Sequence, residues 1–185
     1  LCLDFDGIDT VSDFQQLMLG KRPVKKACDV LLVPTTCGTG SEVTNVAVML
    51  LKSLNVKVGL ANPALYAKSA AMIPALLKTL PHKPMVLSAI DALIHACESY
   101  LSPKASPLTR TFSVEASVRI LEGFVQMANG READEEILGS FLIASNMAGI
   151  AFGNAGCGMV HAMSYPIGGT YHLPQFQYPA GYDGW

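Results

Sequence analysis

Two side chains with metal-binding chemistry lie one helical turn apart in the stretch AIDALIHACESY. Asp91 and His95 are four residues apart, so on a helix both side chains project from one face. A carboxylate oxygen and an imidazole nitrogen placed in this way can bind one divalent ion. A direct hydrogen bond between the two side chains explains the spacing about as well. Glu98 lies three residues beyond His95 and is expected to be exposed or to orient a partner, not to act as a third ligand.

His161 lies apart from this pair, directly after a long segment that contains no Asp, Glu, Lys or Arg. A lone histidine on an apolar face is usually hydrogen-bonded within a core. Taken alone, His161 therefore indicates no particular function.

A second chemically interesting stretch is TTCGTGSE, which follows a short apolar run. Its Thr and Ser hydroxyl groups could contact an anion, and its glycines would let backbone N–H groups approach that anion closely. The stretch matches neither G-x-G-x-x-G nor G-x-x-x-x-G-K-[ST], so the general phosphate-binding motifs do not identify it. A simple turn remains an equal alternative. Lys57, a lone cation among apolar residues, could either reach water or meet a phosphate or ribose.

The elements around these residues change character along the chain. The run CDVLLVPTT, residues 28–36, predicts a short buried strand that ends at Pro34. Residues 43–50 and 56–61 predict two further strands, and residues 69–74 a weaker one. The first part of the chain therefore resembles an α/β domain, with strands joined by short connections.

The later residues have helical period and length, separated by Pro or Gly. Helices are predicted over residues 75–81, 83–102, 107–129 and 133–156. The fold class predicted is α/β plus all-α. We expect a partial nucleotide-binding domain over residues 1–78 and a partial helical domain over residues 79–185.

Charge and cysteine content exclude some classes of protein. The net charge is −2 and the short KRPVKK run is the only basic cluster, so no nucleic-acid partner is expected. Five widely spaced cysteines with no CxxC pair, and no secretory leader before them, indicate reduced thiols in a cytoplasmic protein. The charge-free segment would pass a loose membrane-span test. Its Asn and Ser residues and its Gly and Ala content favour a buried central helix and no membrane partner.

Three motifs together carry a resemblance that none carries alone. They are VPTTCGTGSEVTN, IDALIHACESYLSPKASPLT and GMVHAMSYPIGGTYHLP. In this order and spacing they resemble the iron-containing (group III) alcohol dehydrogenase family, over about residues 29–174. Details of the second and third motifs are more similar to the 4-hydroxybutyrate dehydrogenase branch than to propanediol or ethanol oxidisers.

The resemblance implies a fold and a reaction. The fold, related to dehydroquinate synthase, has a Rossmann-like domain that binds NAD or NADP, a helical domain that holds Fe²⁺ or Zn²⁺, and an active site between them. The implied reaction transfers a hydride between the cofactor and a small alcohol or aldehyde substrate. The metal ligands implied are Asp91, His95 and His161. The cofactor contacts implied are Thr35, Thr36, Cys37, Gly38, Thr39, Gly40, Ser41 and Lys57.

The chain also departs from the family pattern. Gln175 stands where the family has its fourth ligand, a histidine, and an amide oxygen is a weaker ligand than imidazole. His172 lies nearby but matches a non-ligand position. Tyr165 stands where many members carry a histidine used for proton relay, and a phenol can still donate a hydrogen bond there.

Both ends of the family fold are expected to be missing, which gives two opposing hypotheses. The chain is either a partial alcohol dehydrogenase of 4-hydroxybutyrate type, or an inactive remnant with impaired metal binding. We also expect that the charge-free helix is partly exposed, which predicts aggregation or a homo-oligomer.

Overall fold

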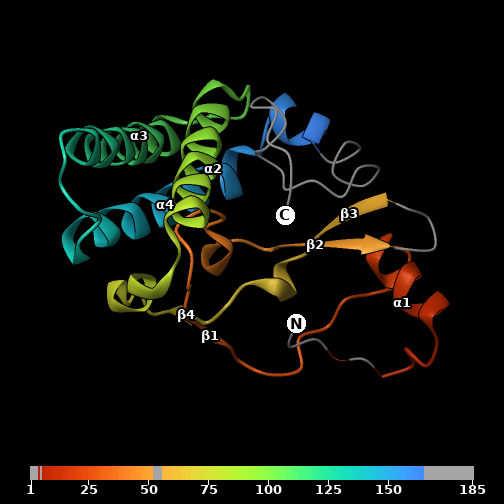
Figure 1. Cartoon of the computed structure of the whole chain (residues 1–185). Helices are drawn as coiled ribbons and strands as arrows, with labels where there is room; N and C mark the ends of the chain where they lie inside the picture. Colours follow the sequence, from red (N-terminus) through yellow and green to blue (C-terminus); the bar gives the residue numbers. More distant parts are fainter. Residues whose placement is uncertain (1–3, 5, 52–55, 165–185) are drawn as a thin grey trace.

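The computed structural model describes residue 4 and residues 6–51 and 56–164. Three long helices lie together, and a β-hairpin and a short helix lie beside them (Figure 1). The elements, with η for 3₁₀-helices, are α1 Val11–Met18, β1 Leu31–Leu32, η1 Ser41–Val43, β2 Val46–Leu51, β3 Val56–Ala61, η2 Pro63–Leu65, β4 Ser69–Ala70, η3 Pro74–Thr79, α2 His82–Leu101, α3 Pro107–Ala128 and α4 Glu135–Ala155. A further helical turn covers residues 159–164.

The strands predicted from the sequence are confirmed in position. β2 and β3 pair antiparallel, with Val46 opposite Ala61 and Leu51 opposite Val56. β1 pairs in parallel with β4, at Leu31 opposite Ser69.

The prediction that the first strand is fully buried is wrong. Leu31 is 59% exposed and Val33 is 38% exposed. Among the described residues β1 has two residues and a single neighbour, β4. A strand this short with one partner has little apolar surface to cover it, so β-branched composition alone did not ensure burial.

Helix α1 was not predicted from the sequence. Thr10 accepts a hydrogen bond from the Asp13 N–H, and the Asp13 carboxylate accepts one from the Thr10 N–H, which is a capping box. Leu17 and Met18 on α1 form a small apolar cluster with Leu51 and Leu60 of the hairpin. The Thr-x-x-Asp pattern was the available signal for this helix.

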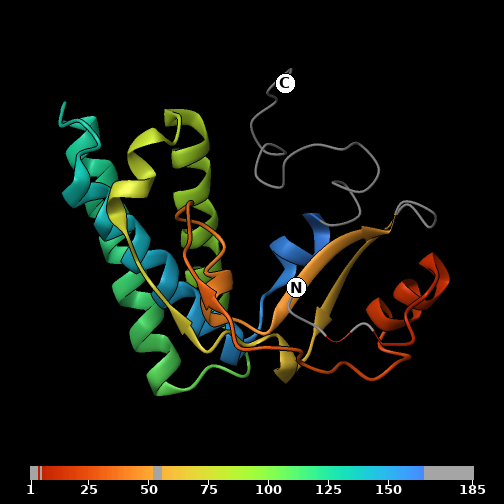
Figure 2. The ribbon, with the colours of Figure 1, turned by 90° about the horizontal axis from the view of Figure 1, so that it is seen from below.

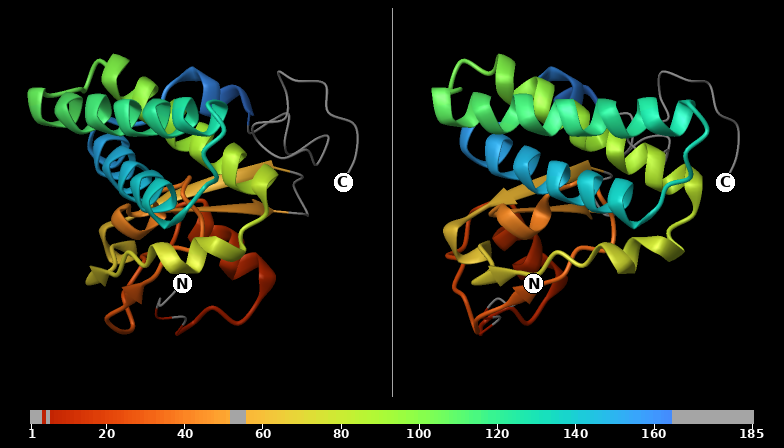
Figure 3. Two further views of the ribbon diagram at one scale, coloured as in Figure 1. Left: turned by 60° about the vertical axis from the view of Figure 1, so that its left-hand side comes forward. Right: turned by 90° about the vertical axis from the view of Figure 1, so that its left-hand side faces the viewer.

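The three predicted long helices are confirmed, and they pack against one another around the main core (Figures 2 and 3). Alanines fill much of this core and allow the helix axes to approach closely. Ser99 of α2 and Ser113 of α3 are hydrogen-bonded at 2.8 Å between their hydroxyl groups, in the buried interface. The alanines of the core are Ala89, Ala92, Ala96, Ala116, Ala144 and Ala148.

Helix α4 is free of charged residues from Ile137 on, and it is long and apolar enough to cross a membrane by length and composition. Phe141 and Leu142 are buried in the main core, as in the central helix of a folded domain. The expectation that α4 is partly exposed holds at Ile143, which is 42% exposed, although most of the large apolar side chains exposed on these helices lie on α3. Those of α3 are Leu108, Val114, Val118, Leu121 and Val125.

The glycine loop, which is the TTCGTGSE stretch of residues 35–42, packs directly on α4. Gly40 has φ +55°, a conformation that favours glycine. A Cβ atom at Gly149 of α4 would lie 2.7 Å from the Gly40 carbonyl oxygen. The two glycines together therefore set how closely the loop approaches the helices, and Asn146 adds a hydrogen bond of 3.0 Å to Glu42.

Replacing Gly149 by alanine should destabilise the fold, because the new methyl group would meet rigid backbone. We expect Gly149→Ala to lower the free energy of unfolding by about 1–3 kcal/mol in urea denaturation. Gly153→Ala on the same helix is the matched control, since its Cβ atom would find its nearest neighbour at 3.6 Å. That control should gain up to about 1 kcal/mol from helix propensity. Equal stability of the two variants would contradict the close-approach argument.

Candidate metal centre

Helix α2 carries two of the predicted ligands on one buried face. Asp91 is 7% exposed and His95 is 6% exposed. Asp91 Oδ1 lies 3.5 Å from His95 Nδ1, and neither atom makes a hydrogen bond with any described residue. The direct Asp–His hydrogen bond that the spacing also allowed is therefore absent from this part of the chain.

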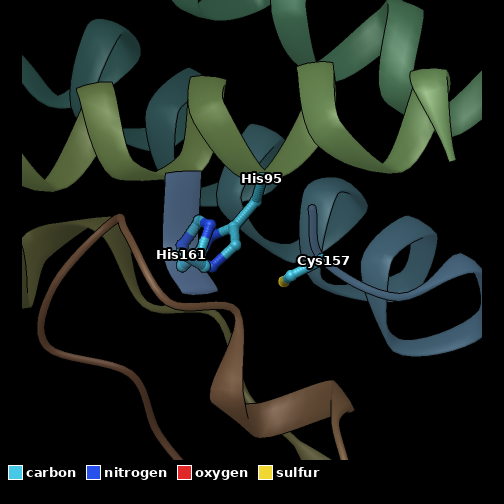
Figure 4. Close-up of side chains that lie close together, drawn as sticks. All are labelled: His95, Cys157 and His161. Carbon is cyan, nitrogen blue, oxygen red and sulfur yellow. The ribbon is translucent and has the colours of Figure 1, made fainter. Parts of the chain in front are cut away.

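The third predicted ligand reaches the same place from the turn at residues 159–164. His161 Nε2 lies 3.5 Å from Asp91 Oδ1, the oxygen that also faces His95. The two imidazole rings stack with centroids 4.2 Å apart. The Phe152 ring of α4 also stacks on the His95 ring, with centroids 4.3 Å apart. Figure 4 shows His95 and His161 side by side. The structure thus brings Asp91, His95 and His161 together.

Two of the three distances between the predicted ligands fit a divalent ion. Tetrahedral ligands at about 2.0–2.2 Å from a metal lie about 3.3–3.6 Å from each other, and both Asp91–imidazole distances fall in this range. Among the described residues, the ion pairs of Asp91 and Glu98 involve only His95 and His161, and no Lys or Arg. Two buried carboxylates without a lysine or arginine partner favour a bound cation.

The surroundings of His95 favour its neutral form, which is the form that binds a metal ion. Burial lowers the pKa of His95 to about 4, although the Asp91 charge opposes this shift. Burial also lowers the pKa of His161, but the neighbouring carboxylates of Asp91 and Glu98 outweigh it and raise the pKa above its ordinary value. Burial raises the pKa of Glu98, yet the hydrogen bond from His161 and two backbone N–H groups bring it below the usual range. His95 is therefore neutral and Glu98 ionised at neutral pH.

Sequence reasoning missed two features of this centre. Cys157 was treated only as a reduced thiol, yet its Sγ and one nitrogen each of His95 and His161 lie within 4.8 Å of one another (Figure 4). Glu98 contacts His161. The sequence could suggest only that Glu98 shares a helix face with Asp91 and His95 and could orient a partner. The partner of Glu98 lies far along the chain and had no local signal.

The glycine loop lies next to the metal centre. A Cβ atom at Gly38 would lie 3.2 Å from Asp91 Oδ2 and 3.0 Å from the Ser88 carbonyl oxygen. Gly38 and Gly40 therefore serve close packing on the helices, a role the sequence analysis did not assign. The Cys37 side chain is fully buried near the Met85 carbonyl oxygen, and burial raises its pKa to about 12.

The residues of the loop that carry hydroxyl groups face outward. Thr35, Thr36, Thr39 and Ser41 are exposed, and the Thr39 and Ser41 hydroxyl groups lie 3.1 Å apart. Lys57 lies on β3 opposite Leu50, but its side chain is outside the described residues. Tyr165, His172 and Gln175 also lie outside them, so their predicted roles stay predictions.

Comparisons with known proteins identify the family of this chain. The family profile described as "Iron-containing alcohol dehydrogenase" matches residues 5–74, and the one described as "Fe-containing alcohol dehydrogenase family, C-terminal" matches residues 85–177. The chain is 54% identical over 163 residues to 4-hydroxybutyrate dehydrogenase of Clostridium kluyveri, covering 88% of this chain and 44% of that protein. It is 36% identical over 164 residues to long-chain-alcohol dehydrogenase 1 of Geobacillus thermodenitrificans, covering 89% and 41%.

Solved structures give the same result. An iron-containing alcohol dehydrogenase of Thermotoga maritima superposes with a TM-score of 0.78 at 26% identity, covering 92% of this chain and 45% of that one. Sulfoacetaldehyde reductase of Bifidobacterium kashiwanohense, in complex with NAD⁺, superposes with a TM-score of 0.76 at 26% identity, covering 83% and 41%. The chain spans less than half the length of these relatives. Matched by the family over both of its parts and folded as its members are, the chain belongs to the iron-containing alcohol dehydrogenase family.

Proposed function

We propose that this chain is part of a metal-dependent, NAD(P)-dependent alcohol dehydrogenase that interconverts 4-hydroxybutyrate and succinic semialdehyde. The observation that carries the enzyme class is the convergence of Asp91, His95 and His161 on one point, next to the glycine loop. The substrate rests on similarity: identity to the Clostridium kluyveri 4-hydroxybutyrate dehydrogenase is 54%, against 36% for the long-chain-alcohol dehydrogenase.

The proposed chemistry divides between the metal centre and the glycine loop. Asp91, His95 and His161 would hold Fe²⁺ or Zn²⁺, which as a Lewis acid supplies a lowered alcohol pKa in one direction and a polarised carbonyl in the other. His95 is neutral and buried, so its nitrogen lone pair is available to an ion without loss of a proton. Phe152 and His161 stack on the ring and restrict its rotation.

The loop is proposed to hold the cofactor beside this centre. Backbone groups and the exposed hydroxyl groups of Thr35, Thr36, Thr39 and Ser41 can donate hydrogen bonds to NAD or NADP, and Lys57 is proposed as a further contact. Because Gly38 lies against Asp91, a cofactor on this loop would lie near the metal-bound substrate. Tyr165 is proposed as the hydrogen-bond donor in proton transfer.

The remaining proposals concern the protein as a whole. We propose a cytoplasmic homo-oligomer with no nucleic-acid or membrane partner, and the exposed apolar side chains of α3 support self-association. The alternative, an inactive remnant, rests on Gln175 in place of a ligand histidine.

Metal binding separates the two functional hypotheses. We expect the anaerobically purified chain to bind one Fe(II) or Zn(II) ion per protein. Asp91→Ala should weaken binding at least about 100-fold, more than the loss of an outer contact to a ligand. Glu115→Ala is the control, because it removes an exposed carboxylate that pairs with Arg119 on α3. A Gln175→His variant that binds when the natural sequence does not would favour the remnant.

Activity tests the substrate directly. We expect reduction of succinic semialdehyde with NADH, lost on His161→Ala by at least about 100-fold because a metal ligand is removed. Turnover equal to that of the His161→Ala variant would contradict the enzyme hypothesis. Equal or faster turnover of ethanol or propanediol by the same protein would retain the enzyme class and contradict the 4-hydroxybutyrate assignment.

A further inference from the structure

We propose that Glu98 is a positioning residue, which holds His161 in the orientation and tautomer that bind the metal ion. This inference rests on the proposed metal centre. It adds a requirement that the three ligands alone do not contain, because it makes the strength of the centre depend on a carboxylate that does not itself face the ion.

Both oxygens of Glu98 hold the segment that carries His161. Glu98 Oε2 lies 2.5 Å from His161 Nδ1, and Glu98 Oε1 accepts a hydrogen bond of 2.6 Å from the Val160 N–H. The Glu98 side chain is 9% exposed, so these contacts are largely shielded from water. Charge-assisted hydrogen bonds of this length are strong and directional.

The turn before His161 packs directly against the Glu98 carboxylate. A Cβ atom at Gly158 would lie 2.9 Å from Glu98 Oε1 and 3.1 Å from its Cδ. Any larger residue at position 158 would displace either the turn or the carboxylate. Glycine here therefore permits the approach that the two hydrogen bonds require.

The contact decides which nitrogen of His161 is free for an ion. In neutral His161, the contact with the Glu98 carboxylate places the ring proton on Nδ1, which donates a hydrogen bond to Oε2, so the lone pair lies on Nε2. Nε2 is the atom that lies 3.5 Å from Asp91 Oδ1, where the ion is proposed to bind. A carboxylate on the far side of the ring also makes the imidazole a stronger ligand.

The same helix face therefore supplies two of the proposed ligands and the support for the third. Asp91 and His95 bind from α2 itself, and Glu98, one turn further on, fixes the ligand that comes from residues 159–164. A purely structural role for Glu98 would tie the turn to α2 without any effect on the metal. The two roles differ in what they predict for metal affinity and for the protonation of one ring nitrogen.

The first test is competition of chelators for Co(II) and Zn(II), with visible spectra of the Co(II)-loaded protein. We expect Glu98→Ala to weaken affinity about 10–100-fold and to alter the Co(II) ligand-field bands. Glu98→Gln should weaken it less, because an amide oxygen can still accept from Nδ1. Glu42→Gln is the matched control: Glu42 is a buried carboxylate of similar exposure that accepts from Asn146 and touches no ligand. It should bind within about twofold of the natural sequence, since its ligand contacts are unchanged.

Each outcome bears on a distinct claim. If the natural sequence binds one ion and both Glu98 variants bind it equally tightly with unchanged spectra, the positioning role is overturned and the metal centre stands. If the natural sequence binds no ion, the metal centre and the inference both fall.

A second measurement avoids any dependence on how the Glu98 variants fold. Long-range ¹H–¹⁵N spectra of the Zn(II)-loaded natural protein report which ring nitrogen carries the proton, and His161→Gln identifies the signal. We expect a proton on His161 Nδ1 and none on Nε2. A proton on Nε2, or none on either nitrogen, would overturn the proposal.

Discussion

The described structure depends on two carboxylates buried on one face of α2 with only histidines to neutralise them. Asp91 and Glu98 are both shielded from water, and no lysine or arginine among the described residues pairs with either. Removing a charge from water costs several kcal/mol unless a partner compensates it. The stacked imidazoles, together with the proposed ion between Asp91 and these rings, would meet this requirement. The arrangement of α2 against the turn at residues 159–164 follows from it.

Small residues let the rest of the chain approach the face of α2 that carries Asp91 and Glu98. Gly38 lies against α2 beside Asp91, Gly40 meets Gly149 of α4, and Gly158 meets Glu98. The loop proposed to bind a cofactor and the helices proposed to bind a metal are thus held in direct contact. Two parts of the chain with different secondary structure meet at one site because no side chain separates them.

Much of this could be predicted from the sequence where the signal is local. The period of 3.6 residues located α2, α3 and α4, and the spacing of Asp91 and His95 placed both on one face. The proximity of His161 to Asp91 follows from the packing of α3 and α4, which no local pattern encodes; only the family resemblance suggested it. Cys157 was missed for the same reason, and so was the identity of His161 as the partner that Glu98 could orient. The burial of the first strand was wrong because composition does not specify the neighbours of a strand.

The separation of the proposed ligands along the chain links the metal centre to the stability of the helices. His95 lies in α2 and His161 follows α4, so the whole of α3 and α4 lies between two proposed ligands of one ion. An ion bound at both would be a reversible cross-link that closes this long loop, as a disulfide does. Such a cross-link would reduce the conformational entropy of the unfolded chain. Chelation would then loosen the three-helix unit as a whole, so metal supply and resistance to proteolysis would be coupled.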